Sequence, residues 1–204
     1  MKYNKIFLVG FRATGKTTLG KILAEKLGWS FWDSDFLITQ EAGQNAQELT
    51  KNGTDWRKFR KIENEVLFEL SKLNGAVISC GGGVGVNNVA DSETHKTFGE
   101  LNKEILDSAE QSLTVLLVSS EKSIKERLER QYKNKKIMPF LNSETAKNAK
   151  VETDPQKLIE QQVADSMKTY EQRKPLYDTL TEVKIDTDQG RLENTAEEII
   201  KYVR

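Results

Sequence analysis

The chain has 204 residues, a length that corresponds to one domain rather than two independent ones. Its 31 Lys and Arg residues balance 31 Asp and Glu residues, so the excess positive charge of a typical nucleic-acid or anionic-membrane binder is absent. Apolar residues make up 37% of the chain, enough for a core, and a single cysteine and a single histidine exclude a disulfide scaffold and a structural zinc site.

Short apolar runs alternate with longer amphipathic segments. Lys5–Val9 predicts a strand that stops at Gly10, and apolar residues at three-to-four spacing predict a helix from Gly15 to Leu27, capped by Gly28. Further strands are predicted at Trp29–Trp32, Gly75–Ser79, Ser112–Val118 and Glu182–Ile185, and further helices at 55–72, 100–110, 120–131, 156–172 and 194–203. Strands that alternate with helices predict a mostly parallel sheet covered on both faces.

Residues 132–154 are polar and weakly periodic, and no element is assigned to them. A segment of this length inside a compact domain is either a solvated insertion or a functional lid, and both interpretations stay open. The longest apolar run near the middle of the chain, Val115–Val118, is far shorter than the roughly 18 residues that span a bilayer. We therefore expect a cytoplasmic protein.

Residues 10–17 read Gly-Phe-Arg-Ala-Thr-Gly-Lys-Thr, which matches G-x-x-x-x-G-K-[ST] between a predicted strand and a predicted helix. Gly10 and Gly15 permit a backbone whose N–H groups converge on a phosphate, and the helix N-terminus adds its dipole. Lys16 would meet the outer phosphates, and the Thr17 hydroxyl can ligate Mg²⁺. We predict that the chain binds a nucleoside triphosphate through Ala13, Thr14, Gly15, Lys16, Thr17 and Thr18.

Other classes of phosphate-loop protein lack their markers here. A GTPase would need N-K-x-D, but Asn134-Lys135-Lys136-Ile137 lacks the Asp and follows a helix. A motor or transporter ATPase would have an apolar strand ending in an acidic pair, and neither Val77–Cys80 nor Val115–Val118 ends that way. A small kinase that phosphorylates another small molecule remains.

Five motifs occur in order along nearly the whole chain: the phosphate loop Gly10–Gly20, Asp33-Ser34-Asp35, Phe59-Arg60-x-x-Glu63, Gly81-Gly82-Gly83 and Arg173-x-Pro175-Leu176-Tyr177. Together they resemble the motifs of the shikimate kinase family, which has the nucleoside-monophosphate-kinase-like fold. The resemblance implies a three-layer α/β sandwich around a five-stranded parallel sheet of order 2-3-1-4-5. It also implies one kinase domain over 1–204, with a substrate-binding region near 34–63 and a lid near 132–154.

The resemblance further implies transfer of the γ-phosphoryl group of ATP to shikimate, giving shikimate 3-phosphate in aromatic amino acid biosynthesis. Asp33 and Thr17 would hold Mg²⁺, whereas Asp35 would hold the ring hydroxyls and act with Lys16 in catalysis. The substrate carboxylate would lie between Arg60 and Arg173, beside Gly82 and Gly83, and guanidinium groups suit a carboxylate. We expect a monomer with no nucleic-acid or membrane partner.

The sequence departs from the family in the lid, where Met138-Pro139-Phe140-Leu141 stands for the family's R-P-L-L. Arg130, Lys133, Lys135 or Lys136, just upstream, could supply the missing charge, and Ala13 replaces a glycine that many members have. Two other functions stay open: a related small-molecule kinase, and a kinase-like binding or regulatory protein without turnover. Simpler structural roles also stay open, with Asp33 as a helix cap, Arg60–Glu63 as a helix pair and Arg173 as a surface residue.

Overall fold

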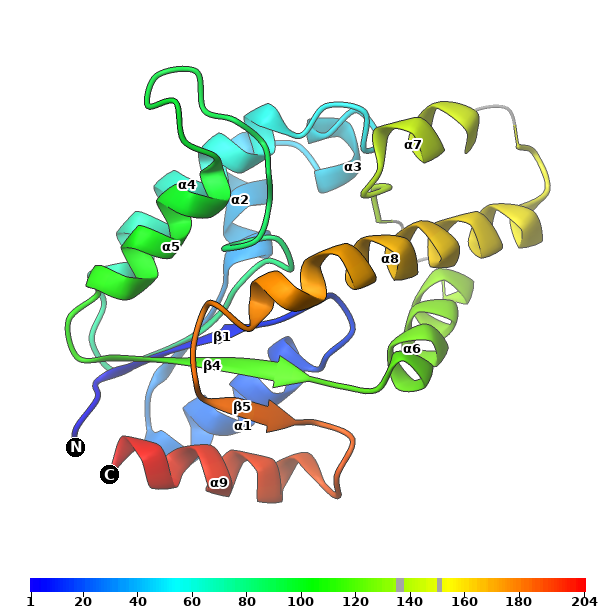
Figure 1. Cartoon of the computed structure of the whole chain (residues 1–204). Helices are drawn as coiled ribbons and strands as arrows, with labels where there is room; N and C mark the ends of the chain where they lie inside the picture. The colour runs from blue at the N-terminus through cyan, green and yellow to red at the C-terminus, as the bar shows by residue number, and fades with distance from the viewer. Residues whose placement is uncertain (135–137, 150–151) are drawn as a thin grey trace.

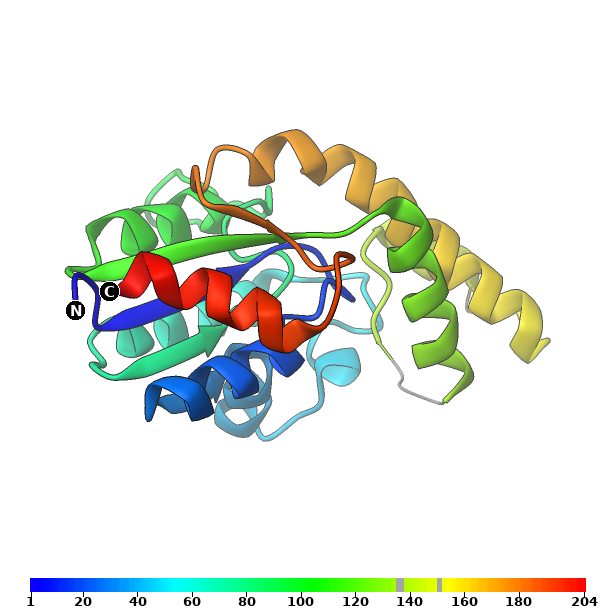
Figure 2. The same ribbon diagram turned by 90° about the horizontal axis from the view of Figure 1, so that it is seen from below.

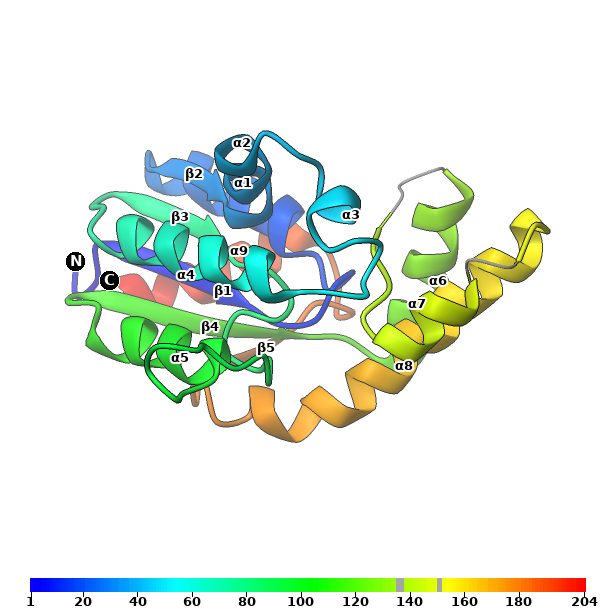
Figure 3. The same cartoon turned by 90° about the horizontal axis from the view of Figure 1, so that it is seen from above.

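The structure, a computed structural model, describes residues 1–134, 138–149 and 152–204. Its sheet has five parallel strands in the order β2-β3-β1-β4-β5, as Figure 3 shows, and both the order and the parallel sense confirm the prediction. The strands are β1 (Lys5–Val9), β2 (Ser30–Asp33), β3 (Ala76–Ser79), β4 (Ser112–Val118) and β5 (Lys184–Asp186).

Helices cover both faces of the sheet, which confirms three layers (Figures 1 and 2). Ile6 and Leu8 of β1 pack toward α1 (Lys16–Leu27) and α9 (Leu192–Val203). Phe7 and Val9, pointing the other way, pack toward α4 (Arg57–Ser71), α5 (Phe98–Ser108) and α8 (Pro155–Tyr177). Because successive side chains of a strand face opposite ways, the continuous apolar run of β1 fills both cores.

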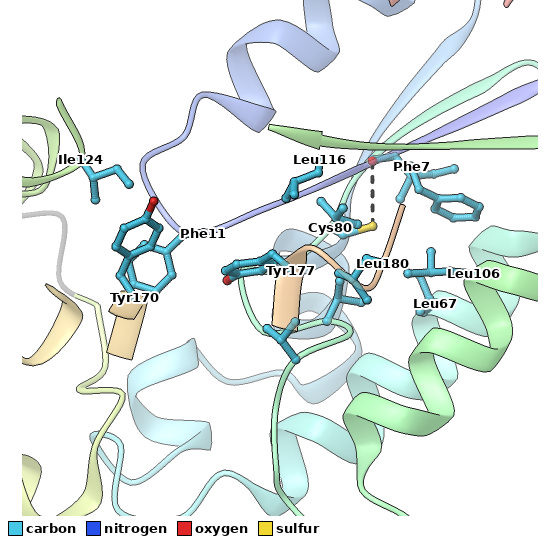
Figure 4. Close-up of a cluster of buried hydrophobic side chains, with 14 of the residues drawn as sticks. Phe7, Phe11, Leu67, Cys80, Leu106, Leu116, Ile124, Tyr170, Tyr177 and Leu180 are labelled. Carbon is cyan, nitrogen blue, oxygen red and sulfur yellow. Dashed lines mark hydrogen bonds between the residues drawn. The ribbon is translucent and has the colours of Figure 1, made fainter. Parts of the chain in front are cut away.

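The core on the α4–α5–α8 side reaches from the sheet to the phosphate loop (Figure 4). Phe11 of that loop packs against Tyr170 of α8 with ring centroids 5.2 Å apart. Cys80, directly after β3, is buried in the same cluster, and burial raises the pKa of its thiol. Cys80 is therefore a packing residue, and the loop is anchored to α8 through an aromatic pair.

Three helices that the sequence analysis did not assign are α2 (Ser34–Ala42), α3 (Ala46–Leu49) and α7 (Ser143–Ala149). The first two begin at side-chain caps, because Asp33 caps α2 and Asn45 forms a capping box with Glu48 in α3. α7 has only alanines on its buried side, which gives no apolar periodicity to detect.

Residues 132–154 are thus not free of regular structure, since α6 (Glu121–Lys133) enters the segment and α7 lies within it. The helix predicted at 156–172 extends to Tyr177 and contains Pro175. This proline lies in the last turn, where its missing N–H removes only one helical hydrogen bond.

Helices α6, α7 and α8 project beyond the carboxyl ends of the strands, on one side of the phosphate loop (Figures 1 and 3). We call residues 138–142 the strap; they precede α7 and pass close to that loop. Among the described helices, none is both long enough and apolar enough to cross a membrane.

Candidate active site

The phosphate loop connects β1 to α1 and depends on backbone conformations that glycine favours. Gly10 and Gly15 have φ values of 135° and 93°, and a Cβ on Gly10 would lie 2.5 Å from the Leu117 carbonyl oxygen. Ala13 also lies in the left-handed region, with φ 65°, which is costly for a residue with a Cβ. The loop therefore turns sharply at the end of β1 and leads directly into α1.

Hydrogen bonds occupy the carbonyl groups of the loop. Arg127 of α6 donates to the Ala13 carbonyl at 3.1 Å, and the Thr187 hydroxyl donates to the Thr14 carbonyl at 3.0 Å. No side chain caps α1, and within the described ranges no hydrogen bond uses the N–H groups of residues 13–18. These N–H groups at a helix N-terminus form an anion site.

Lys16 lies across the loop and is buried. Its ammonium donates to the carbonyls of Gly10 at 2.9 Å and Phe11 at 2.7 Å. Burial lowers the pKa of Lys16 to about 8, and the Asp35 carboxylate partly offsets this effect. A phosphate near the ammonium would favour its charged form.

Thr17 and Asp33 lie next to each other at the mouth of the loop. The Thr17 hydroxyl donates to Asp33 Oδ2 at 2.9 Å, while Asp33 Oδ1 accepts from the N–H groups of Asp35 and Phe36. Asp33 is therefore the cap of α2 and also faces Thr17. Two hard oxygens suit Mg²⁺, which commonly binds one or two carboxylates together with phosphates and water. Among the described residues, no group of three His, Cys, Asp or Glu side chains offers an all-protein metal site.

A cavity of about 250 Å³ lies beside the phosphate loop. It brings together the predicted metal and substrate residues Thr17, Asp33, Asp35, Arg60, Gly82, Gly83 and Arg173. It is also lined by Arg12, Trp56, Met138 and Pro139, which the sequence analysis did not assign to the acceptor site. Segments from the phosphate loop, the start of α2, α4, the glycine triplet, the strap and α8 thus meet at one cavity.

Arg60 is held rigidly in this cavity wall. Its Nη1 donates to both carboxylate oxygens of Glu63 at 2.8 Å, and the pair is buried, with Arg60 3% exposed. Arg60 and Glu63 do form the i,i+3 pair on α4 that the sequence suggested, but the pair is buried instead of exposed on the surface. Arg60 Nε and Trp56 Nε1 are buried without a hydrogen-bond partner in the described parts of the chain, and both residues line the cavity. Unpaired buried donors of this kind suit an acceptor-rich ligand.

Arg173 is half-buried on α8 and donates to the Gly82 carbonyl at 3.4 Å. It is not the fully exposed residue of the alternative interpretation. Burial lowers the pKa of Arg173 to about 10; Tyr177 opposes this effect, and the nearby cations Arg60 and Arg12 add to it. Guanidinium groups gathered in this way favour an anionic ligand.

Asp35 lines the same cavity as Thr17 and the two arginines. It is exposed as a whole residue, and its Oδ1 atom lies against Gly81. Burial raises the pKa of Asp35 to about 6; Asp33 and Glu63 add to the rise, and Lys16 and Arg60 oppose it. A carboxyl group that titrates near the working pH suits a general base.

The glycine triplet allows three close approaches. A Cβ would lie 2.7 Å from Asp35 Oδ1 at Gly81, 3.1 Å from the Arg12 backbone nitrogen at Gly82, and 2.5 Å from Arg60 Nη2 at Gly83. Any side chain at the first or third position would displace a charged group of the cavity. The triplet is therefore a packing requirement of the site.

The upstream lid cations are not brought to the cavity within the described structure. Arg130 is exposed on α6, and Lys133 lines a separate groove between α6 and α8. Lys135 and Lys136 lie outside the described residues. Besides Arg60 and Arg173, the cavity is lined by the cation Arg12, which stands at a variable position of the phosphate-loop motif, so the motif gave no reason to select it.

A phosphate-binding loop that faces a cavity with a carboxylate and two arginines defines a phosphate-loop kinase of small molecules. Comparison with known proteins identifies the group within this class. The family model described as "Shikimate kinase" matches residues 12–204. The chain belongs to the shikimate kinase family.

Individual relatives align with this chain over most of their length. The shikimate kinases of Chlorobium chlorochromatii and Caldanaerobacter subterraneus are each 30% identical to this chain; the alignments cover 97% and 98% of this chain and 90% and 96% of the relatives. The solved shikimate kinase of Acinetobacter baumannii in complex with shikimate has a TM-score of 0.68 and 27% identity, and the match covers 98% of this chain and 93% of that one. The Bacteroides thetaiotaomicron shikimate kinase, at 23% identity and TM-score 0.65 over 98% of both chains, supports the fold alone.

Proposed function

We propose that this protein transfers the γ-phosphoryl group of ATP to shikimate, giving shikimate 3-phosphate. The observation that carries the proposal is that Asp35, the phosphate-loop residue Thr17 and the two arginines Arg60 and Arg173 line a single cavity. A polyhydroxylated carboxylic acid needs cations for its carboxylate and an acceptor for its hydroxyls, and this cavity offers both.

The phosphate loop holds the nucleotide in this proposal. The free N–H groups of residues 13–18 and the Lys16 ammonium bind its phosphates, and ATP supplies the γ-phosphoryl group. Mg²⁺ fits the Thr17 hydroxyl and the Asp33 carboxylate, where it would neutralise phosphate charge.

The acceptor side positions one hydroxyl group. Arg60 and Arg173 bind the substrate carboxylate, and the backbone at Gly82 and Gly83 closes the pocket. Asp35 holds the reacting hydroxyl and accepts its proton. Catalysis then rests on positioning and on charge neutralisation, as phosphoryl transfer requires.

We further propose that residues 1–204 act as a single kinase domain, with a substrate-binding region near 34–63 and a lid near 132–154. The strap of this lid passes beside the phosphate loop and leads into α7 (Figure 3). A monomeric state and a cytoplasmic location stay predictions, to be tested by sedimentation and by cell fractionation.

A coupled assay of ADP release with shikimate and a small panel of other hydroxy acids tests the function. We expect turnover with shikimate, and none with the Lys16→Met variant as the matched control. Turnover with another hydroxy acid but not with shikimate would mean that the protein is a kinase with a different substrate.

Met138 favours a second candidate, a binding or regulatory protein without turnover, because it puts an uncharged side chain at the strap position that lines the cavity. Calorimetry separates the two candidates. Binding of both ATP and shikimate without any ADP release would support the second one.

A further inference from the structure

Arg12 is a cation of the cavity that the proposed function does not use. It stands two residues after Gly10 in the phosphate loop, and its half-buried side chain lines the same cavity as Thr17 and Asp35. Its Nη1 donates to the Tyr132 hydroxyl at 3.3 Å and to the Pro139 carbonyl at 3.4 Å. Both bonds are long and both acceptors are neutral.

Two neighbouring cations, Lys16 and Arg60, have stronger interactions than Arg12, whereas Arg173 has only the 3.4 Å bond to the Gly82 carbonyl. Lys16 donates to two loop carbonyls at 2.9 Å and 2.7 Å, and Arg60 forms a buried ion pair with Glu63. Arg12 has no ion pair with any carboxylate in the described parts of the chain. Burial is the main cause that lowers the pKa of Lys16 and of Arg173, and the positive charge of Arg12 lowers both pKa values further. The charge of Arg12 therefore has no direct ion pair and acts only at longer range on Asp165, in a cluster of cations that an anion would stabilise.

The strap places this guanidinium at the edge of the cavity. Pro139, which accepts from Arg12, directly follows Met138, and both line the cavity without bringing a charge. The strap is held from the other side by α8, because Asp165 accepts from the N–H groups of Leu141 at 2.6 Å and Asn142 at 3.1 Å. Arg12 thus lies between a fixed strap and a fixed phosphate loop.

The backbone of Arg12 is positioned as well. A Cβ on Gly82 would lie 3.1 Å from the Arg12 nitrogen, so the glycine triplet packs directly against this residue. Arg12 belongs to the phosphate loop and also lines the acceptor cavity. The phosphoryl group that passes from the nucleotide to the acceptor therefore has to move past Arg12.

We propose that Arg12 contacts the phosphoryl group during transfer and supplies the positive charge that the strap lacks. This inference rests on the proposed function. The acceptor hydroxyl oxygen forms a bond to the γ-phosphorus, the bond from that phosphorus to the β–γ bridging oxygen breaks, ADP leaves with the electron pair, and the hydroxyl proton passes to Asp35. Arg12 keeps its protons and neutralises charge on the equatorial oxygens of the phosphoryl group. An arginine that contacts a transferring phosphoryl group in this way can raise the rate by about 10³–10⁵.

The kinetic test compares Arg12→Met and Arg12→Lys with a control variant. We expect Arg12→Met to lower kcat at least tenfold with the KM for shikimate within threefold of wild type, and Arg12→Lys to lose less. The control, Arg130→Met, removes an exposed cation of α6 that does not line the cavity, and it should stay within threefold of wild type. A higher KM with kcat unchanged in Arg12→Met would overturn the proposal, because Arg12 would then bind the acceptor.

A binding measurement gives a second readout that needs no turnover. ADP with aluminium fluoride imitates the transferring phosphoryl group, and its affinity is measured by calorimetry without an acceptor. Arg12→Met should bind it at least tenfold more weakly, bind ADP alone within threefold, and melt within 3 °C of wild type. Equal affinities of Arg12→Met and wild type for ADP with aluminium fluoride would overturn the inference even if wild type phosphorylates shikimate. A wild type inactive with shikimate would instead overturn the proposed function, and the binding comparison would still decide the role of Arg12.

Discussion

The two walls of the cavity are built in different ways. The phosphate wall consists of consecutive residues, Gly10–Thr18, and presents mainly backbone N–H groups set by the loop conformation. The acceptor wall takes its residues from the start of α2, from α4, from the glycine triplet and from the end of α8, and presents side chains held by ion pairing and burial. A change in the first wall should therefore act locally, whereas a change in the second should spread to its partners.

The largest expected effect is at Asp35, where the two walls meet. Asp35→Asn removes the proton acceptor, so we expect kcat to fall by about 10²–10⁴ while ATP affinity stays nearly unchanged. Asp33→Asn, the matched variant on the phosphate side, should instead weaken the binding of ATP with Mg²⁺. Calorimetry with each ligand decides; a loss of ATP affinity in Asp35→Asn with shikimate affinity intact would reverse the two assignments.

The two arginines of the acceptor wall should behave differently from each other. Arg173→Ala should weaken shikimate binding by about 1.5–3 kcal/mol, the range for hydrogen bonds to charged groups, with little change in stability. Arg60→Ala should weaken binding similarly and also destabilise the fold by about 3–5 kcal/mol, because it leaves Glu63 buried and unpaired. Shikimate titrations and urea unfolding measure both quantities. Unchanged shikimate affinity in both variants would remove the carboxylate clamp.

The pH dependence should contain one group from each wall. Asp35 must be ionised to accept a proton, so with its pKa raised to about 6 we expect kcat/KM to fall about tenfold per pH unit below that value. Lys16, with its pKa lowered to about 8, must be charged to meet phosphate, so kcat/KM for ATP should fall above pH 8. A profile that is flat from pH 5 to 7 would contradict the assignment of Asp35 as the base.

The smallest expected effect concerns the phosphate wall alone. Ala13 has φ 65°, a conformation that costs a residue with a Cβ and that glycine adopts freely. Ala13→Gly should stabilise the protein by about 0.5–1 kcal/mol in urea unfolding, after allowance for the added freedom of the unfolded chain. The KM for ATP should stay within twofold. A loss of stability would mean that the alanine methyl makes packing contacts that outweigh the strain.

The contrast between a wall of consecutive residues and a wall of distant residues also explains which parts of the structure the sequence predicts. Lys5–Val9, the phosphate loop and the helix that follows are set by neighbouring residues, and the structure confirms the strand and the helix. It also confirms the sheet order, which only the family resemblance implied. The short helix α7 escaped prediction because its buried side consists of alanines. The capping box of α3, Asn45 with Glu48, is by contrast a local sequence signal for a helix N-terminus, whereas contacts made by small residues leave little trace in the sequence pattern.

The acceptor wall shows the same limit. Asp35, Arg60 and Arg173 were selected only because five motifs occurred in the order of a known family, and the structure brings them to one cavity. Their individual roles stay predictions. Arg12 was passed over because no local rule marks a variable loop position, and only its approach to Pro139, 127 residues away, connects it with the strap.

Phosphorus NMR of the wild-type protein with ATP, Mg²⁺ and shikimate tests the central claim most directly, because it separates transfer from hydrolysis. We predict that the γ-phosphate resonance of ATP disappears as one phosphate-monoester resonance, coupled to a ring proton, grows in equal amount with ADP. The appearance of inorganic phosphate in place of the ester, or of neither product although both ligands bind, would contradict the assignment of this protein as a kinase that phosphorylates shikimate.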